Sequence, residues 1–582
     1  MRNPATIRQH RSRRLGPAPF KKFGTRPGLS AMLNSPLVDT SSLPPIRARS
    51  AEEGACRISW LDLLFPAALM LICFFSGIGA IGLTGPDEPR YAAIARAMAR
   101  TGDWVTPRLN GQPWFEKPAL YYWIAGAAFQ IFGDGEFAMR LPSVLAAVLA
   151  TLAASWAALR AYGLDAARLT LLLLPVSVGL IGFSHSASGD MLFAALLTAA
   201  AAVAAEMLQQ KRTGTLSRIS FGFLLGAAVL AKGPAAVLLA GGSVLLWALT
   251  SRRFAAAFQF FHPVCLAAFA ATAVPWYALC AARNPDFIRV FFFEHNIQRY
   301  LTPMFQHPQP LWFFGPVLLL GVFPWTVLAI PLILDAWKAF QSGRWRDSPT
   351  LFFACWVLAP LLFFSFSESK LPGYILPAVP PLALILAATL ARRLVSPGSS
   401  PGIWIGLCAL SFPLLAFFAG AWLKRLPAES GLAVPDAWTL PLAVAAAGGL
   451  ACAALAWTRR YRAAITGVTL VIATLVVVAA QSALPKLDPY LSSRPAAHAT
   501  AAEIRSTDSL AALGIDHSLQ YGLEYYLDRP VPDWTGGTSG LTWVWTIPAG
   551  VDDLQRVGFR CTVVRKFSRH AWLVQIDPST SP

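Results

Sequence analysis

Charged side chains are scarce in this chain of 582 residues: 13% of the residues are Asp, Glu, Lys or Arg, and 55% are hydrophobic. A soluble domain carries about 25% charged residues, so the composition excludes an ordinary soluble globular protein. Long apolar runs recur along most of the chain, and each can cross the ~30 Å hydrocarbon core of a bilayer. The sequence therefore predicts a polytopic membrane protein.

Acidic residues are fewer than basic ones, 30 Asp+Glu against 48 Lys+Arg, and the formal net charge is +18. In a soluble protein this excess would indicate a nucleic-acid partner. Here the basic residues gather in the N-terminal tail and in short loops between apolar runs, a pattern that orients membrane proteins. We therefore expect membrane lipids around the chain and no nucleic-acid partner.

Paired cysteines and closely spaced histidines are also lacking. The eight cysteines include no CxxC pair, and six of them fall in or beside apolar segments, which argues against a disulfide framework. No HxxxH or HExxH spacing occurs. The adjacent Glu294 and His295 offer only two ligands, so we predict no metal site and expect a structural hydrogen bond there. Metal dependence stays open, but no metal is expected to be obligatory.

About thirteen apolar segments are candidate membrane helices. They cover roughly 60–83, 139–160, 169–187, 191–208, 219–231, 234–250, 257–280, 311–334, 349–366, 374–391, 402–421, 438–457 and 463–483. With the N-terminal tail placed in the cytoplasm, every predicted inside loop carries Lys or Arg, as the positive-inside rule requires. The segments that remain outside are 84–138, 184–190, 232–233, 281–310, 367–373 and the C-terminal region.

Three regions follow from this pattern. Residues 1–57 are predicted to be a disordered basic cytoplasmic tail, within which Met32 is an alternative start. Residues 58–484 form the all-α transmembrane domain. Residues 485–582 are predicted to be a small periplasmic α/β domain, with a helix at 497–513 and strands at 541–547 and 571–576.

The first outside loop concentrates charge beside the membrane. Asp87 and Glu88 follow the first apolar run, and Arg90, Glu116 and Lys117 lie in the same loop. A solvated loop with an interfacial helix would explain this composition. An active site would explain it too, because acids and cations at headgroup level would meet a lipid phosphate there.

The motifs of the outside loops resemble those of bacterial aminoarabinose transferases, within the wider protein O-mannosyltransferase-like family of the GT-C fold. The resemblance covers roughly residues 60–390. It is carried by Asp87-Glu88-Pro89-Arg90-Tyr91, Gly102-Asp103-Trp104, Phe115-Glu116-Lys117-Pro118, Ala231-Lys232-Gly233, Glu294-His295-Asn296 with Arg299-Tyr300, and Ser369-Lys370-Leu371-Pro372-Gly373-Tyr374. The resemblance implies a GT-C membrane domain of thirteen helices followed by a C-terminal periplasmic domain.

Several single residues allow a structural and a functional interpretation. Asp190 suits a helix N-cap, but the family has a second acidic residue at this place. Lys232 and Lys370 each interrupt apolar sequence, where a lysine either extends to the interface or binds phosphate. Glu116, Glu294 and His295 are candidate supporting residues.

The resemblance implies a sugar donor on polyprenyl phosphate, commonly undecaprenyl phosphate, in the bacterial inner membrane. We expect Arg90, Tyr91, Lys117, Lys232 and Lys370 to bind the donor and its leaving phosphate. Asp87 is the expected residue nearest the acceptor, and Glu88 and Asp190 are secondary catalytic candidates. Inversion at the anomeric carbon would follow from attack on the side opposite the phosphate.

The sequence indicates the class of reaction but leaves the acceptor open. Lipid A phosphate is the first choice, and a protein hydroxyl or another envelope glycan is the alternative. A lipid or sugar transporter is the rival from another class, but it predicts charges near the bilayer midplane and paired broken helices. A structural or assembly protein would not need acids and bases gathered in the outside loops.

Overall fold

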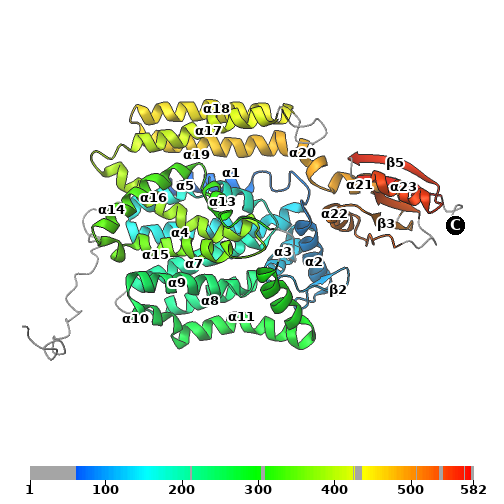
Figure 1. The fold of residues 1–582 in the computed structure, drawn as a ribbon, viewed down its shortest axis with the longest axis horizontal. Helices are drawn as coiled ribbons and strands as arrows, with labels where there is room; N and C mark the ends of the chain where they lie inside the picture. The colour runs from blue at the N-terminus through cyan, green and yellow to red at the C-terminus, as the bar shows by residue number, and fades with distance from the viewer. Residues whose placement is uncertain are drawn as a thin grey trace, which may run out of the picture. The chain divides into compact units, whose positions relative to one another are not determined.

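Helices make up most of the computed structural model, which describes residues 60–209, 213–302, 308–423, 425, 435–505, 507–535, 542–568 and 571–577 (Figure 1). The predicted tail at 1–57 lies outside these ranges. Within them, eight helices are long and apolar enough to cross a membrane, or ten if each of two bent pairs forms one span. The chain is therefore a multi-span membrane protein.

The long helices correspond to predicted spans. They are α4 (Glu136–Tyr162), α7 (Gly189–Gln209), α8 (Thr215–Lys232), α11 (Pro263–Arg283), α16 (Val379–Val395) with the preceding η7 (Pro372–Ala378), α17 (Pro401–Leu423), α18 (Pro435–Trp457) and α19 (Tyr461–Val478). Three further predicted spans are shorter apolar helices, α1 (Trp60–Phe75), α9 (Ala235–Ser251) and α15 (Pro349–Ser365). The span predicted at 60–83 ends at Phe75, ahead of a stretch that contains Gly77, Gly79 and Gly82.

Two predicted spans are bent pairs of helices. The segment 169–187 is α5 (Leu164–Leu173) and α6 (Val178–Ser184), and the helix axis bends by 55° between them. The segment 311–334 is α13 (Phe314–Gly321) followed by η5 (Trp325–Leu328) and α14 (Ala329–Gln341), and here the bend is 109°. Pro324 lies at this second break, where its missing N–H prevents a continuous helical ladder.

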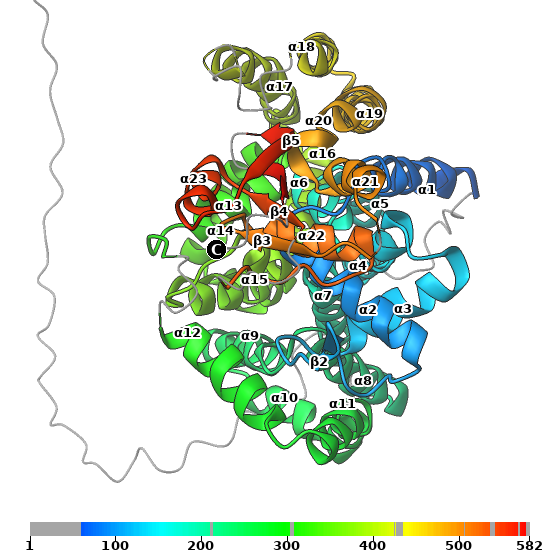
Figure 2. The ribbon, with the colours of Figure 1, turned by 90° about the vertical axis from the view of Figure 1, so that its right-hand side faces the viewer.

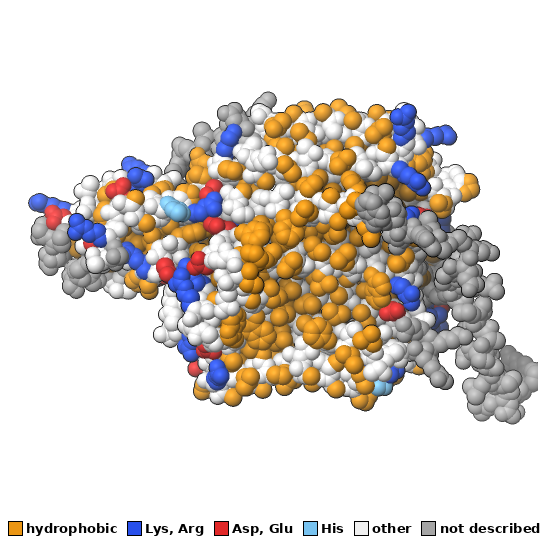
Figure 3. Space-filling model, turned by 180° about the vertical axis from the view of Figure 1, so that it is seen from behind, with side chains coloured by type: hydrophobic (Ala, Val, Ile, Leu, Met, Phe, Trp, Pro, Cys, Tyr) orange, Lys and Arg blue, Asp and Glu red, His pale blue; other side chains and the backbone are white. Residues whose placement is uncertain are grey.

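Alanine-rich helices form the centre of the bundle. Helices α7 and α16 are buried around most of their circumference, because small side chains let neighbouring helices approach closely. Helices α17 and α18 expose leucine and phenylalanine side chains instead. Figure 3 shows hydrophobic side chains covering the face of the bundle between two margins where charged side chains gather, as expected of a surface that contacts lipid.

The predicted first outside loop consists largely of helices and a short pair of strands. It contains α2 (Asp87–Thr101), the paired strands β1 (Arg108–Leu109) and β2 (Gln112–Pro113), and the apolar helix α3 (Leu120–Phe132). Helix α2 ends because Gly102 adopts a left-handed conformation with φ of 70°, which glycine tolerates. The other short helices are α10 (Phe254–Ala257), η3 (Phe258–Phe261), η4 (Arg289–Gln298), α12 (Arg299–Leu301) and η6 (Arg344–Asp347).

A small α/β region follows α19 through η9 (Ala479–Ala483), α20 (Leu484–Leu491) and α21 (Arg494–Glu503). Its strands β3 (Leu510–Leu513), β4 (Trp543–Thr546), β5 (Cys561–Ser568) and β6 (Ala571–Ile576) form one sheet in the order β3-β4-β6-β5. Strands β3 and β4 are parallel, and the other pairs are antiparallel. Helices α22 (His517–Leu527) and α23 (Pro548–Arg556) complete the region.

Both strands predicted from the sequence are confirmed as β4 and β6. The predicted helix at 497–513 is wrong beyond Glu503, because Leu510–Leu513 pairs with β4 as a strand. A four-residue apolar run fits a buried strand and a helix equally well, and only the partner strand decides between them.

Helix α22 packs against α2 (Figure 2). The Tyr521 ring lies 5.7 Å from the Arg90 guanidinium, and the Tyr525 ring lies 4.3 Å from that of Arg96. The Tyr526 hydroxyl accepts from the Leu83 N–H at 2.7 Å. These contacts place the C-terminal α/β region over the helix that begins with Asp87.

Candidate active site

Five segments that the sequence analysis predicts to lie outside the membrane meet around one cavity. Its lining comes from the start of α2, the 114–122 segment, the α7 start, the α8 end, α12 and the segment that leads into α16. The lining residues are Asp87, Tyr91, Lys117, Tyr121, Tyr122, Ser188, Gly189, Asp190, Ala231, Lys232, Arg299, Leu371 and Tyr374. Three cations and two carboxylates therefore share this cavity with four tyrosines.

Asp190 and Lys232 form a salt bridge within the cavity. Asp190 lies in the first turn of α7, and Lys232 is the last residue of α8, which ends there because Gly233 takes a φ of 92°. The Lys232 ammonium also lies 4.8 Å from the Tyr374 ring and 5.5 Å from that of Phe193. The lysine is thus held at the cavity by a carboxylate and two aromatic faces.

Asp87 is the more accessible of the two cavity carboxylates. It begins α2, its side chain is 51% exposed, and it pairs with Arg90 three residues later. The neighbouring Tyr91 is buried and packs edge-on against Tyr122 at 5.7 Å. Asp87 therefore presents a solvent-accessible carboxylate on a rigid helix start.

Glu116 is the shared counter-ion beside the cavity. Its side chain is 8% exposed, and its oxygens lie 2.8 Å from Arg90 Nη2, 3.2 Å from Lys117 Nζ and 3.2 Å from Arg299 Nη1. Burial raises the pKa of Glu116, but the three cations lower it by more than burial raises it. The resulting pKa is well below the usual range for a glutamate. Glu116 is consequently an anion that holds two of the cavity cations in place.

Glu88 is buried away from the cavity lining. Its carboxylate pairs with Arg140 at 2.7 Å and accepts from the N–H groups of Thr84 and Ala187 at 2.8 and 2.6 Å. Arg140 is 1% exposed and also donates to three backbone carbonyls, those of Ile78, Ile81 and Gly82. Glu88 thus ties α2 to the segment that leads to Asp190.

Four other predicted site residues do not line the cavity. Lys370 is buried, and its ammonium donates to the Ser367 carbonyl at 2.5 Å. Glu294 pairs with the exposed Arg289. His295 lies beside the Glu116 cluster, where burial, Lys117 and Arg299 lower its pKa against the opposing effect of Glu116, so its neutral form is favoured. Arg90 also lies outside the lining, paired with Asp87 and Glu116.

Arg299 and Tyr374 are cavity residues that the predicted site omitted. Arg299 Nε donates to the Tyr374 hydroxyl at 3.1 Å, and Arg299 Nη1 reaches Glu116. Both residues belong to the family-like sequence motifs that also contain His295 and Lys370. Weighing every charged or tyrosine side chain in those motifs would have found them.

The cavity has the chemistry of an anion site with a nearby acid. Lys117, Lys232 and Arg299 can neutralise a phosphate whose charge grows as a bond breaks. Asp87 can accept a proton or orient a second substrate from the accessible side. Among the described residues, no group of three or more His, Cys, Asp and Glu side chains is arranged to hold a metal ion.

The membrane domain matches a known protein family in part. Residues 63–291 match the model of the dolichyl-phosphate-mannose-protein mannosyltransferase family. The chain is 33% identical over 336 residues to the undecaprenyl phosphate-alpha-4-amino-4-deoxy-L-arabinose arabinosyl transferase of Edwardsiella ictaluri. This match covers 57% of this chain and 59% of that protein. It is 35% identical over 371 residues to the corresponding Pseudomonas aeruginosa protein, covering 63% and 66%.

The crystal structure of ArnT from Cupriavidus metallidurans bound to undecaprenyl phosphate shares the fold. It superposes with a TM-score of 0.75 at 24% identity and covers 88% of this chain and 97% of that chain. The chain therefore has the polytopic GT-C membrane fold of this structure. The resemblance predicted from the sequence is thereby confirmed. The sequence matches span 59% and 66% of the two relatives, less than two thirds of their length.

Proposed function

We propose that this chain is a membrane glycosyltransferase that moves a sugar from polyprenyl phosphate to an acceptor of the cell envelope. The observation that carries the proposal is the cavity in which Lys117, Lys232 and Arg299 face Asp87 and Asp190. The names of the relatives support undecaprenyl phosphate as the carrier and 4-amino-4-deoxy-L-arabinose as the sugar. Lipid A phosphate is the proposed acceptor.

In the proposed reaction, the bond between the anomeric carbon and the donor phosphate oxygen breaks, and the electron pair leaves with the phosphate. Lys117, Lys232 and Arg299 neutralise the charge that develops there. An acceptor phosphate oxygen attacks the opposite face of the sugar, which inverts the anomeric carbon. A phosphate monoester is already largely ionised at neutral pH, so Asp87 orients the acceptor rather than removing a proton.

A protein hydroxyl is the second candidate acceptor, because residues 63–291 match a family of protein mannosyltransferases. A hydroxyl must lose its proton as it attacks, and Asp87 is the accessible carboxylate that can accept it. The two acceptors therefore assign different tasks to the same residue.

We also propose a location and a membrane orientation for the chain. We place the chain in the bacterial inner membrane, with the N-terminus in the cytoplasm and the cavity and residues 485–582 in the periplasm. The basic loops predicted inside support this orientation. Cations of the chain itself surround the phosphate position, and we therefore propose that no divalent metal is obligatory. Full transfer activity after treatment with a chelator would support that last point, and reversible loss would refute it.

The test is sugar transfer in cells that make the donor and lack their own transferase. Wild type, Asp87→Asn and the control Asp286→Asn are expressed to equal levels, and lipid A and envelope proteins are analysed by mass spectrometry. Asp286 is an exposed carboxylate paired with Arg289, outside the cavity lining. We expect wild type and Asp286→Asn to add the sugar to lipid A, and Asp87→Asn to lose transfer on the order of 100-fold because the acceptor is no longer oriented.

Other outcomes discriminate among the alternatives. A sugar on an envelope protein instead of lipid A would keep the transferase and overturn the acceptor. Equal transfer by Asp87→Asn and wild type would remove Asp87 from the reaction. No product from any variant, with the donor shown to be present, would contradict the transferase proposal, and lipid transport would be tested next.

A further inference from the structure

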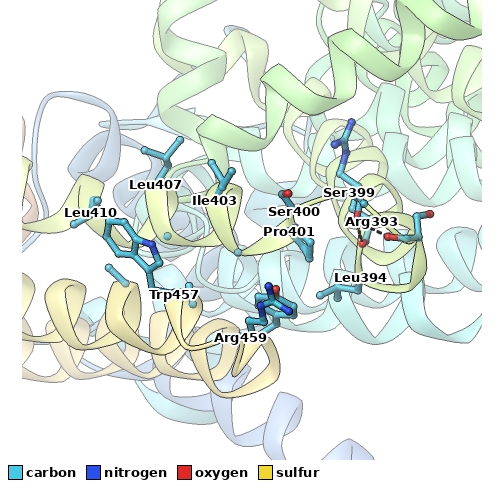
Figure 4. Close-up of a pocket in the computed structure, with 17 residues that line it drawn as sticks. Arg393, Leu394, Ser399, Ser400, Pro401, Ile403, Leu407, Leu410, Trp457 and Arg459 are labelled. Carbon is cyan, nitrogen blue, oxygen red and sulfur yellow. Dashed lines mark hydrogen bonds between the residues drawn. The ribbon is translucent and has the colours of Figure 1, made fainter.

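A second cavity lies at the far end of α16 from the candidate active site. It has a volume of about 610 Å³ and is bounded by the end of α16, the 396–400 turn, the start of α17 and the turn between α18 and α19 (Figure 4). Helix α16 leads from the active-site segment to Arg393, so its 17 residues separate the two cavities by roughly 25 Å. This cavity is thus distinct from the proposed transfer site.

The segments around this cavity carry basic residues and no acids. Residues 369–428 and 437–487 contain no Asp or Glu, whereas Arg393 and Arg459 line the cavity. Asp335 of α14 neutralises Arg393 at 2.5 Å. Arg459 forms no salt bridge with any residue that the structure describes. A cavity with one unneutralised guanidinium favours an anionic ligand.

The mouth of the same cavity is apolar. Ile403 and Leu407 of α17 are 59% and 42% exposed, and Trp457 at the end of α18 is 81% exposed. In Figure 4 these side chains lie along α17 and α18, with Arg459 next to the turn. A tryptophan beside arginine is typical of the level where headgroups meet acyl chains. The arrangement suits an amphiphile better than a free ion.

The backbone at Arg459 is also unusual. Its φ is 61°, in the left-handed region that glycine and asparagine tolerate best. Arginine at this position costs conformational free energy that Asn or Gly would avoid. An Arg459→Asn variant therefore removes the charge without straining the turn.

We propose that this cavity binds the headgroup of an anionic phospholipid. Arg459 contacts the lipid phosphate, and the acyl chains lie along Ile403, Leu407 and Trp457. The predicted orientation puts the cavity at the cytoplasmic leaflet, whose anionic lipids attract basic residues. This inference does not depend on which sugar or acceptor the active site uses.

The test measures lipid binding to the purified full chain by native mass spectrometry. The protein is titrated with phosphatidylglycerol and, separately, with phosphatidylcholine that has the same acyl chains. We expect tighter binding of the first phosphatidylglycerol, and a roughly fivefold weakening of it in Arg459→Asn. Arg462→Asn is the matched control, because Arg462 is exposed nearby and does not line the cavity. It should bind like wild type.

A second variant tests the cavity independently of charge. A Cβ at Gly406 would approach only Ala456, at 3.8 Å, so Gly406→Leu should fold and fill part of the cavity. We expect it to weaken phosphatidylglycerol binding, while unfolding temperatures stay close to that of wild type. Unchanged binding in Gly406→Leu would place the lipid on the outer surface and overturn the cavity assignment.

Three further outcomes would overturn the proposal. Equal binding of the two lipids would show that the headgroup charge is not recognised. Equal weakening by Arg459→Asn and Arg462→Asn would indicate diffuse attraction to a basic surface. Displacement of phosphatidylglycerol by an excess of inorganic phosphate would show that the ligand is a free anion rather than a phospholipid.

Discussion

Lys232 and Lys370 look equivalent at the scale of single residues in the sequence. Each is an isolated lysine beside apolar residues on the predicted outer side. The structure separates them, because Lys232 meets Asp190 at the cavity whereas Lys370 donates to the Ser367 carbonyl. Their environments therefore predict different consequences of losing the charge.

We expect Lys232→Gln to lower sugar transfer on the order of 100-fold, because it removes a cation that would stabilise the leaving phosphate. Lys370→Gln should retain more activity per folded molecule and lower the unfolding temperature, since the Ser367 carbonyl loses its donor. Transfer rates and thermal unfolding of both purified variants provide the comparison. If Lys370→Gln instead lost activity at unchanged stability, Lys370 would be assigned to phosphate binding.

Glu116 leads to a prediction about pH. Its lowered pKa means that the ionised carboxylate stabilises the fold fully above its ordinary pKa of about 4.3, and that this stabilisation is lost as the pH falls further. Glu116→Gln should therefore lower the unfolding temperature at pH 7, because Arg90, Lys117 and Arg299 lose their shared anion.

The difference in unfolding temperature between Glu116→Gln and wild type should shrink as the pH falls below about 4, because the unfolded wild-type chain then binds a proton at Glu116 while the folded protein keeps the carboxylate ionised. Thermal unfolding in detergent across this pH range measures it. A difference that stays constant with pH would show that the carboxylate charge is not what stabilises the cluster.

At the scale of elements, the close approach of η7 to the start of α7 shapes the candidate active site. A Cβ at Gly373 would lie 2.6 Å from Asp190 Oδ2 and 2.9 Å from the Phe183 ring, so only glycine fits. The approach brings Tyr374 over Lys232. The absence of a side chain at Gly373 thus leaves room for Asp190 in the position where it pairs with Lys232.

Gly373→Ala should displace Asp190 and reduce transfer by at least about tenfold, since small misplacements in an active site are costly. Gly315→Ala is the matched control, because a Cβ at Gly315 of the neighbouring α13 meets nothing within 4 Å. Transfer rates, with unfolding temperatures to confirm folding, test the pair. Similar losses in both variants would mean that the effect is not specific to the contact with Asp190.

The whole molecule has a predicted orientation that two cysteines can test. Cys561 is partly exposed on β5, and the other six described cysteines are buried. Cys56 belongs to the predicted cytoplasmic tail. In cells with a permeable outer membrane, an impermeant maleimide should label Cys561 in a Cys56→Ser variant. It should label Cys56 in a Cys561→Ser variant only after the inner membrane is opened.

Labelling should be carried out at alkaline pH, because burial raises the pKa of the Cys561 thiol and lowers its thiolate fraction. Labelling of Cys56 in intact cells, with Cys561 protected, would invert the proposed orientation. It would then move the active-site cavity to the cytoplasmic side as well.

Much of the fold was predictable because hydrophobic length and loop charge are local properties. The apolar segments became helices, including those of the two bent spans, and β4 and β6 appeared where short β-branched and aromatic runs occur. Pro324 marks the break before α14, but the 109° angle was not predicted, because a proline interrupts the helical ladder without fixing the direction in which the chain continues. The strand at Leu510–Leu513 likewise needed β4 as its partner.

By itself, the sequence determined that the chain crosses the membrane many times, and it supplied the acids and cations of the loops that are predicted to lie outside. Only the tertiary structure decided which of them meet. It joined Asp87, Lys117, Asp190, Lys232, Arg299 and Tyr374 around one cavity, while Glu88 was buried against Arg140 and Lys370 turned to a carbonyl. The physical reason is range: hydropathy acts within one helix, whereas a charge finds its partner only when distant segments pack together.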